Sequence, residues 1–480
     1  MGKERKRRTV TDGLTIHFVG IGGIGMSGIA HLLLEAGEAV SGSDVKESQQ
    51  TRELAAKGAR IYIGHAAENV HGAREVVVSS AIRPTNPEII EARRLGIPIR
   101  HRSEKLAELL DARRGITIAG THGKTTTSSM AATLLATAGL NPSYAVGGVI
   151  NTADSNAAGG GSEWFVAEAD ESDGSLVNFH PEIAIITNVE LDHTDYYENL
   201  EQVYNVFLAH LKNIKAGGSV VACVDDPGVR EVLSRAGLSL PLQSGCSRLP
   251  NDVRVMGYGT TEEAELRAEG IESNGFGYTY TAVQNGERLG RFSLNVPGQH
   301  NVLNSLAVIA LGRIVGLDTE TIARGIAAFR GVRRRFQVIA KTEQVTIVDD
   351  YAHHPTELKA TLAAARSLHA GRIVAIFQPH RYSRTQSLAR EFGAAFHDAD
   401  VVVLTDIYPA SEDPIAGVTS ELILQALAEN HHPAAFYVGS LEAAEEFVAA
   451  NVRPGDMILT LGAGDITKCG PSLARRLGCK

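Results

Sequence analysis

The chain has 480 residues, 44% of them hydrophobic and 21% charged, with a formal net charge of −9 and four cysteines. This length exceeds what one hydrophobic core usually supports and indicates about three domains, and the acidic balance argues against nucleic acid as a partner. No window approaches the ~20 apolar residues of a membrane span, so no membrane association is expected. The basic run 3–8 precedes no apolar stretch, so we expect a solvated tail rather than a signal peptide. The widely spaced cysteines lack metal-ligand spacing, which indicates unpaired thiols and a cytoplasmic protein.

The first motif is a glycine-rich turn, GIGGIG, between an apolar strand and an apolar-periodic helix. It places Gly22, Gly23 and Gly25 where a backbone can approach a diphosphate closely. Asp44 lies 19 residues after Gly25, where an acid that binds a ribose would stand. A dinucleotide and a UDP-sugar both carry a diphosphate, so the pattern by itself predicts a pyrophosphate site and leaves NAD and a UDP-sugar as alternatives.

Strands and helices alternate after this motif up to about residue 112, which predicts a parallel sheet with helices on its faces. Ligands of such sheets bind at the carboxyl ends of the strands. The polar residues expected at or after those ends are His65, Ser79, Ser80, Asn86 and Arg102. Each of them, taken singly, is better explained as a capping or turn residue.

A phosphate-binding loop follows a second apolar strand and precedes a helix expected over 128–138. Its glycines let backbone N–H groups close around an anion, Lys124 can reach the terminal phosphates, and the Thr125 hydroxyl can hold Mg²⁺. Ile118 replaces the first glycine of the common pattern, so the loop is a variant, and an incidental turn is the weaker interpretation. The motif predicts a nucleoside triphosphate bound by Gly120, Thr121, His122, Gly123, Lys124, Thr125 and Thr126.

Two polar clusters are expected at the same sheet edge as the phosphate loop. The strand 164–167 leads into four acids within six residues, beginning at Glu168, and the strand 183–188 is followed by His193. Such an acidic run is usually a solvated turn, but the strand before it is buried in character, so divalent-cation binding is the better interpretation. A single histidine after a strand is more often structural. His193 is nevertheless expected as a ligand because it shares the predicted cleft with Thr125 and Glu168.

The region after the acidic clusters is rich in strands and turns over 218–296, which is consistent with an antiparallel part of the central sheet. A helix then carries Asn301 and Asn304 on one face. Helix capping explains one of them, and both together indicate contact with a base or sugar. Three arginines, 333–335, follow at a predicted hinge. They form either a solvated linker or a set of cations, one of which reaches the γ-phosphate when the domains close.

A third α/β unit places two polar clusters at adjacent strand ends. The strand 345–348 runs into DDYAHHP, and the strand 372–377 runs into QPHRYSRT. Further strands at 401–404 and 457–461 complete a doubly wound domain. The predicted fold is therefore α/β with three domains: a Rossmann-like N-terminal domain over 1–112, a central P-loop-type mononucleotide-binding domain over 113–331, and a C-terminal Rossmann-like domain over 332–480.

Five motifs in this order resemble the Mur ligase family: GIGGIGMSGIA, GTHGKTTT, EADESD, DDYAHHPTE and FQPHRYSRT. The resemblance covers nearly the whole chain and is closest to the branch that joins L-alanine to UDP-N-acetylmuramate in peptidoglycan precursor synthesis. It implies that the first domain holds the UDP-sugar rather than NAD. It also implies ATP and Mg²⁺ as cofactors and an acyl-phosphate intermediate. We expect a monomer or a weak homodimer.

The resemblance also implies roles for individual residues. The catalytic group is Lys124, His193, His353, Arg381 and Arg384, in which guanidinium groups suit the alanine carboxylate and a histidine can accept a proton from the ammonium. The nucleotide is expected on the phosphate loop, Asn301, Arg335 or its neighbour Arg334, and Asp350. Metal ligands are expected at Thr125, Glu168 and His193. The remaining substrate-binding residues are Gly22, Gly23, Gly25, His65, Ser79, Arg102, Tyr351 and His380.

One departure and two alternatives accompany the resemblance. Several relatives bridge metals with a carbamylated lysine about fifteen residues after the central histidine, but 204–208 contains no lysine here, and Lys212 is expected on a helix surface. The first alternative function is the recycling ligase that joins a whole tripeptide to the same sugar nucleotide. The second is an NAD-dependent oxidoreductase with an accessory ATPase domain.

Overall fold

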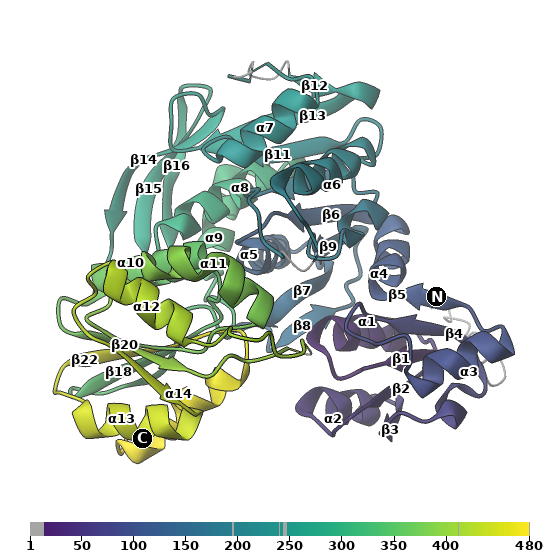
Figure 1. The fold of residues 1–480 in the computed structure, drawn as a ribbon. Coiled ribbons are helices and arrows are strands. Elements are labelled where there is room, and N and C mark those ends of the chain that lie inside the picture. Colours follow the sequence, from purple (N-terminus) through teal and green to yellow (C-terminus); the bar gives the residue numbers. More distant parts are fainter. Residues whose placement is uncertain (1–13, 194–195, 240, 243–246, 411, 480) are drawn as a thin grey trace.

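A computed structural model of the chain contains three α/β units, each built on its own sheet (Figure 1). The structure describes residues 14–193, 196–239, 241–242, 247–410 and 412–479. The basic run 3–8 and Cys246 therefore lie outside the described residues. Three cysteines within these ranges, Cys223, Cys469 and Cys479, are free thiols. No helix in the described part of the chain is long and apolar enough to cross a membrane.

The N-terminal unit has a five-stranded parallel sheet in the order β3-β2-β1-β4-β5. Successive side chains of a strand point to opposite faces, so Phe18 packs with the core of α1 while Val19 packs with Val76 and Ala92 on the other face. The predicted parallel sheet is confirmed. The elements are β1 (Thr15–Val19), α1 (Ile24–Glu35), β2 (Val40–Asp44), α2 (Gln49–Ala56), β3 (Arg60–Ile63), η1 (Ala67–Val70), β4 (Ala73–Val78), α3 (Pro87–Leu95), β5 (Ile99–His101) and α4 (Arg102–Asp111).

The central unit has an eleven-stranded sheet in the order β16-β15-β14-β13-β11-β10-β6-β9-β7-β8, with β12 beside β13. Its middle strands are parallel, and β14 to β16 form the antiparallel part that the sequence predicted. Side chains of α5, α8 and α9 cover one face, and those of α6 and α7 cover the other.

The helices and strands of this unit have the following bounds: β6 (Arg114–Ala119), α5 (Lys124–Thr137), β7 (Ser143–Ile150), β8 (Ser155–Ala158), β9 (Trp164–Glu168), η2 (Ser175–Asn178), β10 (Ile183–Ile186), α6 (Leu200–Lys212), β11 (Ser219–Cys223), α7 (Pro227–Arg235), β12 (Arg248–Leu249), η3 (Pro250–Asp252), β13 (Val253–Gly259), β14 (Leu266–Ser273), β15 (Tyr278–Gln284), β16 (Glu287–Leu294), α8 (His300–Val315) and α9 (Thr319–Ala328). The predicted start of the first helix at residue 128 is wrong. Helix α5 begins at Lys124, because Gly123 with φ +82° ends the loop directly before it.

The C-terminal unit has a six-stranded sheet in the order β17-β18-β22-β19-β20-β21, parallel except for β17. Helices α10 to α12 cover one face, and α13 and α14 cover the other. Strand β21, an edge strand with two exposed side chains, was not predicted. The elements are β17 (Gln337–Lys341), β18 (Val345–Asp350), α10 (Pro355–Leu368), β19 (Ile373–Phe377), α11 (Tyr382–Gly393), β20 (Val401–Thr405), α12 (Glu421–Glu429), β21 (Ala435–Gly439), α13 (Leu441–Asn451), β22 (Asp456–Leu461), η4 (Asp465–Lys468) and α14 (Cys469–Arg476).

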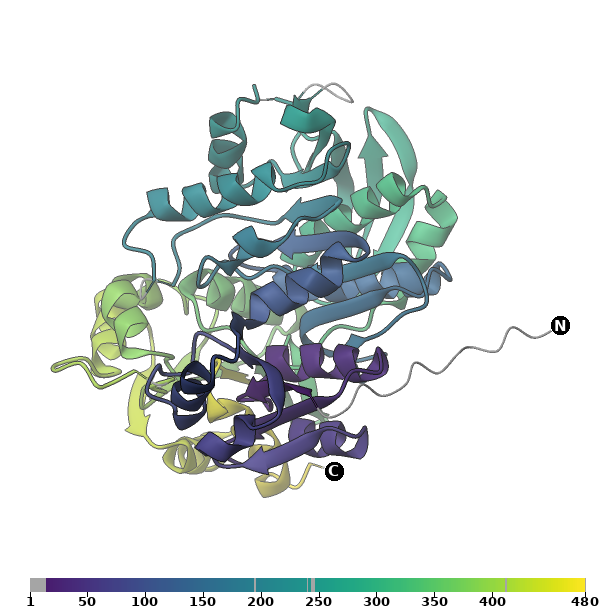
Figure 2. The ribbon, with the colours of Figure 1, turned by 90° about the vertical axis from the view of Figure 1, so that its right-hand side faces the viewer.

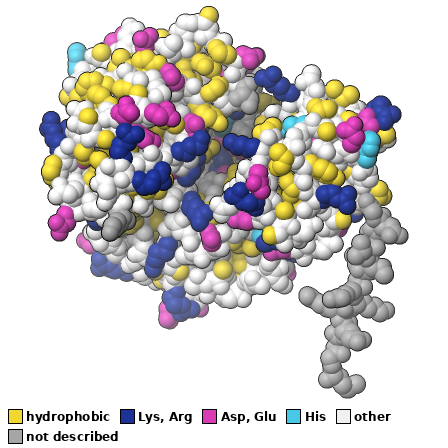
Figure 3. All heavy atoms as spheres, turned by 90° about the horizontal axis from the view of Figure 1, so that it is seen from below, with side chains coloured by type: hydrophobic (Ala, Val, Ile, Leu, Met, Phe, Trp, Pro, Cys, Tyr) yellow, Lys and Arg dark blue, Asp and Glu magenta, His cyan; other side chains and the backbone are white. Residues whose placement is uncertain are grey.

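The N-terminal and C-terminal units both lie below the central unit in two perpendicular views (Figures 1 and 2). Seen from below, lysine and arginine side chains gather around the hollow between these two units (Figure 3). Two arginines make ion pairs with the central unit from its two sides, Arg102 with Asp170 at 3.1 Å and Arg384 with Asp192 at 2.8 Å. The three sheets therefore bring their polar carboxyl-end loops to a common centre.

Candidate active site

The phosphate loop connects β6 to α5 through glycines in backbone conformations that other residues rarely adopt. Gly120 has φ +136°, and a Cβ atom there would lie 2.0 Å from the Thr187 hydroxyl oxygen. The Thr187 hydroxyl and the Asn188 amide both donate to the carbonyl of His122, while the Asn188 side-chain oxygen accepts from the His122 N–H. These contacts hold the loop open against the end of β10, with the first turn of α5 below it.

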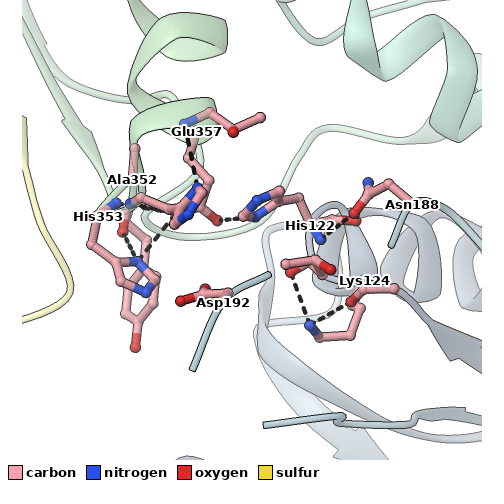
Figure 4. Close-up of polar contacts among 12 residues, drawn as sticks. His122, Lys124, Asn188, Asp192, Ala352, His353 and Glu357 are labelled. Carbon is pink, nitrogen blue, oxygen red and sulfur yellow. Dashed lines mark hydrogen bonds and ion pairs between the residues drawn. The ribbon is translucent and has the colours of Figure 1, made fainter. Parts of the chain in front are cut away.

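Lys124 is buried at the centre of this loop. Its ammonium donates to the carbonyls of Gly120 and Thr121 at 2.6 and 3.1 Å and pairs with Glu171 at 2.8 Å. Burial alone would lower the pKa of Lys124, but Glu171, Asp170 and Glu168 raise it, so the side chain stays charged. Figure 4 shows the Lys124 amine between the loop backbone and a carboxylate. Sequence reasoning recognised the acidic run but did not assign Glu171 as the partner of this lysine.

The predicted metal ligands fall into two groups in the structure. Thr125 donates to Glu168 at 3.0 Å, and Glu168 also accepts from the Gly147 N–H at 2.8 Å. A Cβ atom at Gly147 would lie 2.6 Å from the Glu168 carboxylate, so only glycine leaves this space open. His193, with φ +53°, lies instead at 3.4 Å from Glu171. Two oxygens, a hydroxyl and a carboxylate beside the phosphate loop, are the donor set that Mg²⁺ prefers.

A cavity of about 350 Å³ opens between the phosphate loop and the C-terminal unit. Its lining includes four residues of the predicted phosphate loop, Asn301 of α8 and three residues of the C-terminal unit: His122, Gly123, Thr125, Thr126, Asn301, Arg335, Asp350 and Glu357. The cavity therefore joins the two predicted nucleotide-binding segments.

Only one of the three hinge arginines lines this cavity. Arg333 pairs with Asp154, whereas Arg334 donates to the carbonyl of Gly462 at 2.7 Å. Arg335 faces Glu357 at 3.5 Å, and burial of the guanidinium is outweighed by Glu357 and Asp350, which raise its pKa. The geometry therefore favours Arg335 over Arg334 as the nucleotide contact.

Asn301 and Asp350 both contact the backbone near the cavity. The expectation that capping explains one asparagine is wrong, because Asn301 and Asn304 both lie inside α8, where Asn301 donates to the carbonyl of Pro297 at 2.6 Å. Asp350 accepts from the N–H groups of Phe336 and Ala352 at 2.6 and 2.8 Å. Burial raises the pKa of Asp350 to about 6. Asp350 thus fixes the hinge as well as the cavity wall.

The histidines of the C-terminal unit form a second cluster on the other side of the hinge. The His353 Nδ1 lies 3.0 Å from the Tyr351 carbonyl and 3.1 Å from Glu357, and its ring meets His380 edge to face at 5.5 Å (Figure 4). Burial and the nearby Arg384 lower the pKa of His353. Burial also lowers the pKa of His380 to about 2. Both imidazoles are therefore neutral near neutral pH, but His380 is too weakly basic to take up a proton there, which leaves His353 as the candidate acceptor.

Arg384 and Asp192 form a buried ion pair across the boundary between units. The guanidinium donates twice to one Asp192 oxygen, at 2.8 and 3.3 Å, and approaches His380 Nδ1 at 3.3 Å. Asp192 would have a raised pKa from burial, but Arg384 and His193 hold it well below its usual range. Sequence reasoning did not assign Asp192, although it precedes the singled-out His193 directly. Arg381 lies at the start of α11 with φ +71° and donates its N–H to the carbonyl of Tyr408 at 2.9 Å.

The glycine turn of the N-terminal unit lies against residues that restrict its shape. The Asp44 carboxylate accepts from the Gly22 N–H at 2.9 Å, so it holds the turn rather than standing apart from it. A Cβ atom at Gly25 would lie 3.1 Å from the Arg102 guanidinium, which reaches across to Asp170. Gly23 directly precedes α1, and its N–H donates to the carbonyl of Gly20. Ser79 lies after β4, where its carbonyl accepts from the Ile82 N–H at 3.0 Å. The structure therefore brings Arg102 to the glycine turn and to the acidic run at once.

His65 belongs to a hydrogen-bond network around a fully buried carboxylate. Its Nδ1 lies 3.0 Å from the Ser43 hydroxyl and 3.2 Å from Glu88, which also accepts from Ser43 and Asn69, both at 2.6 Å. Burial alone would raise the pKa of Glu88, but the nearby His17, at 3.8 Å, and the hydrogen bonds from Ser43 and Asn69 outweigh it and lower the pKa to about 2. These contacts fix the position of the His65 ring beyond the ends of β2 and β3.

Replacing Glu88 by glutamine is expected to lower the free energy of unfolding by about 2–3 kcal/mol near pH ~7. The folded-state pKa lies below the unfolded value of about 4.3, so this stabilisation is present above that value and is lost as the pH falls toward ~2. Urea unfolding near pH ~7 and ~3 checks this, because the variant should lose less stability on acidification. Glu38→Gln, which removes an exposed pair with Arg74, is the control. Equal pH dependence of Glu88→Gln and the parent chain would contradict the assignment.

Family models match three consecutive parts of the chain. The Mur ligase family catalytic domain matches residues 15–114, the Mur ligase middle domain matches 118–312, and the Mur ligase glutamate ligase domain matches 334–464. These spans follow the three sheets and together cover more than half of the chain. The chain belongs to the Mur ligase family. The resemblance drawn from the five sequence motifs is confirmed.

This Mur ligase is similar to two UDP-N-acetylmuramate–L-alanine ligases over nearly its whole length. The protein from an Anaeromyxobacter species is 48% identical over 458 residues, which are 95% of this chain and 96% of that protein. The protein from Geotalea daltonii is 45% identical over 462 residues, which are 96% and 98% of the two chains.

Two solved structures have the same architecture. The UDP-N-acetylmuramate-alanine ligase of Thermotoga maritima matches with a TM-score of 0.80 at 30% identity, over 97% of this chain and 99% of that one. A murein peptide ligase from Psychrobacter arcticus matches with a TM-score of 0.72 at 24% identity, over 97% and 99%, and shares the fold. The predicted α/β fold with three sheet-containing domains is confirmed.

Residues 204–208, which contain no lysine, lie in the middle of α6. The buried side chains of this helix include Val203 and Phe207. Lys212 is the last residue of α6 and is exposed, as predicted. The metal-bridging lysine of several relatives therefore has no counterpart in this helix.

Proposed function

We propose that this Mur ligase forms the amide between the lactyl carboxylate of UDP-N-acetylmuramate and the amino group of L-alanine, and converts ATP to ADP and phosphate. One observation carries the proposal: Gly123 and Thr125, which flank Lys124 in the phosphate loop, line the same cavity that Arg335 and Glu357 line from the C-terminal unit. The similarity to ligases of that name over at least 95% of the chain supports the substrates.

The proposed reaction has two steps. An oxygen of the lactyl carboxylate attacks the γ-phosphorus of ATP, and ADP leaves with the bond electrons. A neutral imidazole, for which His353 is placed, then accepts one proton from the alanine ammonium. The resulting amine attacks the acyl carbon, and phosphate leaves and takes up the second proton that the nitrogen loses. Lys124 offsets charge on the transferred phosphoryl group, and Arg335 adds a second cation from the hinge.

The proposal places Mg²⁺ on Thr125 and Glu168, where the open space over Gly147 fits a small cation with oxygen ligands. When bound, Mg²⁺ would neutralise phosphate charge. His193 is proposed as a ligand of a second cation near the sugar substrate, together with its neighbour Glu171. The amino-acid end is proposed at Tyr351, His380, Arg381 and Arg384, and the sugar nucleotide at Gly22, Gly23, Gly25, His65, Ser79 and Arg102.

The proposal also covers the domain boundaries, the cellular location and the oligomeric state. We propose domain boundaries at about residues 112 and 331, a cytoplasmic location and a monomer or weak homodimer. Of the two alternatives, the tripeptide-adding ligase is disfavoured by the comparison of identities: ligases named for L-alanine are 45% and 48% identical over at least 95% of this chain, whereas the tripeptide-named ligase from Neisseria meningitides is 30% identical and covers 67% of it. The oxidoreductase alternative is disfavoured because Asp44, its expected ribose acid, accepts from the Gly22 N–H.

Phosphate release from MgATP, with UDP-N-acetylmuramate and L-alanine each present or omitted, tests the proposed function. We expect release only when both are present, because the acyl phosphate forms on the sugar nucleotide and turns over only when an amine attacks it. Sustained release without alanine would indicate a different ATPase. Release that needs a tripeptide in place of alanine would indicate the recycling ligase.

A further inference from the structure

Three metal-ligating side chains converge at the boundary between the central and C-terminal units, outside the proposed Mg²⁺ site. They are His122 from the phosphate loop, Glu190 from the loop after β10, and His354 at the start of α10, and each offers one ligand atom within 4.8 Å of the others. Among the described residues this is the one such group. None of the three was predicted as a metal ligand from the sequence.

The cluster is partly buried and incompletely hydrogen-bonded: the side chain of His122 is 13% exposed and that of Glu190 is 36% exposed. His354 is only 5% exposed, and its ring lies 4.9 Å from that of His122. His122 Nε2 and Glu190 Oε1 contact each other as an ion pair without hydrogen-bond geometry, and the buried His354 Nε2 has no hydrogen-bond partner among the described residues. Buried polar atoms without hydrogen bonds are costly, and such atoms commonly mark the place of an ion or water.

The surroundings of the cluster match those of a metal site. A ligating histidine usually donates its second ring N–H to a carboxylate, and His122 Nδ1 faces Glu357 at 3.4 Å (Figure 4). His354 Nδ1 lies 4.0 Å from Glu190 and accepts only a long bond, 3.3 Å, from the Thr356 N–H. A cation at Nδ1 would displace that one weak bond. Ligand atoms around a tetrahedral zinc lie about 3.3 Å apart, so shifts of about 1 Å complete the site.

We propose that His122, Glu190 and His354 bind a transition-metal ion of the Zn²⁺ class, which clamps the C-terminal unit to the phosphate loop. Two imidazoles and one carboxylate suit such a metal, whereas Mg²⁺ prefers oxygen ligands only. Because His122 and Glu190 also line the nucleotide cavity, the fourth coordination position is open on that side. The proposal does not depend on the identity of the substrates.

Equilibrium dialysis of the full untagged chain against Zn²⁺, with excess Mg²⁺ present, tests the site. We expect the parent chain to bind one Zn²⁺ at the site. In His354→Asn and in Glu190→Gln, the affinity of the site for Zn²⁺ should be at least about 10-fold lower. Asparagine keeps an acceptor for the Thr356 N–H at the start of α10, so His354→Asn preserves the helix cap. Co²⁺ in place of Zn²⁺ gives a visible absorption spectrum that reports nitrogen and oxygen ligation directly.

The control is His71→Asn, which removes an exposed histidine that pairs with a single carboxylate, Glu91, at 3.0 Å. It should bind Zn²⁺ like the parent chain. Zn²⁺ should also raise the thermal unfolding midpoint of the parent and of His71→Asn, and not of the two cluster variants. Zn²⁺ affinity and a Co²⁺ spectrum that are unchanged in both cluster variants, or no stoichiometric binding by the parent chain, would overturn the proposal.

Discussion

Replacing Lys124 by methionine is expected to slow phosphate release by ~10³-fold or more. The ammonium is held in place before any substrate arrives, by two loop carbonyls and Glu171, so its charge is pre-organised for the transferred phosphoryl group. Removing one such pre-organised group typically costs 10²- to 10³-fold, and cations at phosphoryl groups contribute about 10³- to 10⁵-fold. Steady-state phosphate release with saturating substrates measures the effect.

The same variant is expected to be less stable, by about 3 kcal/mol, because it leaves the Glu171 carboxylate buried without its main cation. A double variant, Lys124→Met with Glu171→Gln, separates the two effects. It should recover most of the lost free energy of unfolding while phosphate release stays slow. If the double variant recovered activity as well, the loss in Lys124→Met would be structural and the proposed role of Lys124 would be wrong.

Replacing Arg384 by methionine is expected to cost ~10²-fold or more in kcat/KM for L-alanine and about 3 kcal/mol of stability. The pair with Asp192 is buried on both sides, with side chains 5% and 6% exposed, and joins the C-terminal unit to the central one. Its loss leaves a buried carboxylate and loosens the contact that positions His380 beside His353. Initial rates over a range of alanine concentrations, together with urea unfolding, measure the two effects.

The matched comparison is Asp192→Asn, alone and combined with Arg384→Met. A double-mutant cycle should give a stability coupling of about 2 kcal/mol or more, because each partner alone is left in a buried site. If Arg384 binds the alanine carboxylate, Arg384→Met should raise KM for alanine more than Asp192→Asn does. Equal KM effects in both single variants would limit Arg384 to joining the two units.

Local patterns in the sequence were sufficient for the parts of the fold that depend on neighbouring residues. Glycine spacing marked both phosphate-type turns, because a positive φ such as that of Gly120 or Gly123 is accessible mainly to glycine. Runs of apolar residues marked the buried parallel strands. The edge strand β21 escaped notice although its sequence, AFYVG, contains an apolar run, and two of its side chains are exposed.

The partners of the site residues could not be read in the same way. Arg384 and Asp192 are 192 residues apart in the chain, and Lys124 and Glu171 are 47 apart. Which acid of the run at 168–173 meets Lys124, and which of three hinge arginines faces the cavity, depends on strand order and on how the C-terminal unit docks. The contacts of His65 with Ser43 and Glu88, 22 and 23 residues away in the chain, could not be read from its place after a strand either.

The sequence by itself determined the family, the three α/β units and the chemical types gathered at their strand ends, because these follow from local periodicity and from motifs a few residues long. Only the tertiary structure decided which of those groups touch. Pairing and burial arise from contacts between distant segments. They set the charge of Lys124 and the neutrality of His380, and they bring His122, Glu190 and His354 together. Electrostatic and ligand-binding properties depend on such distances, and a linear pattern does not contain them.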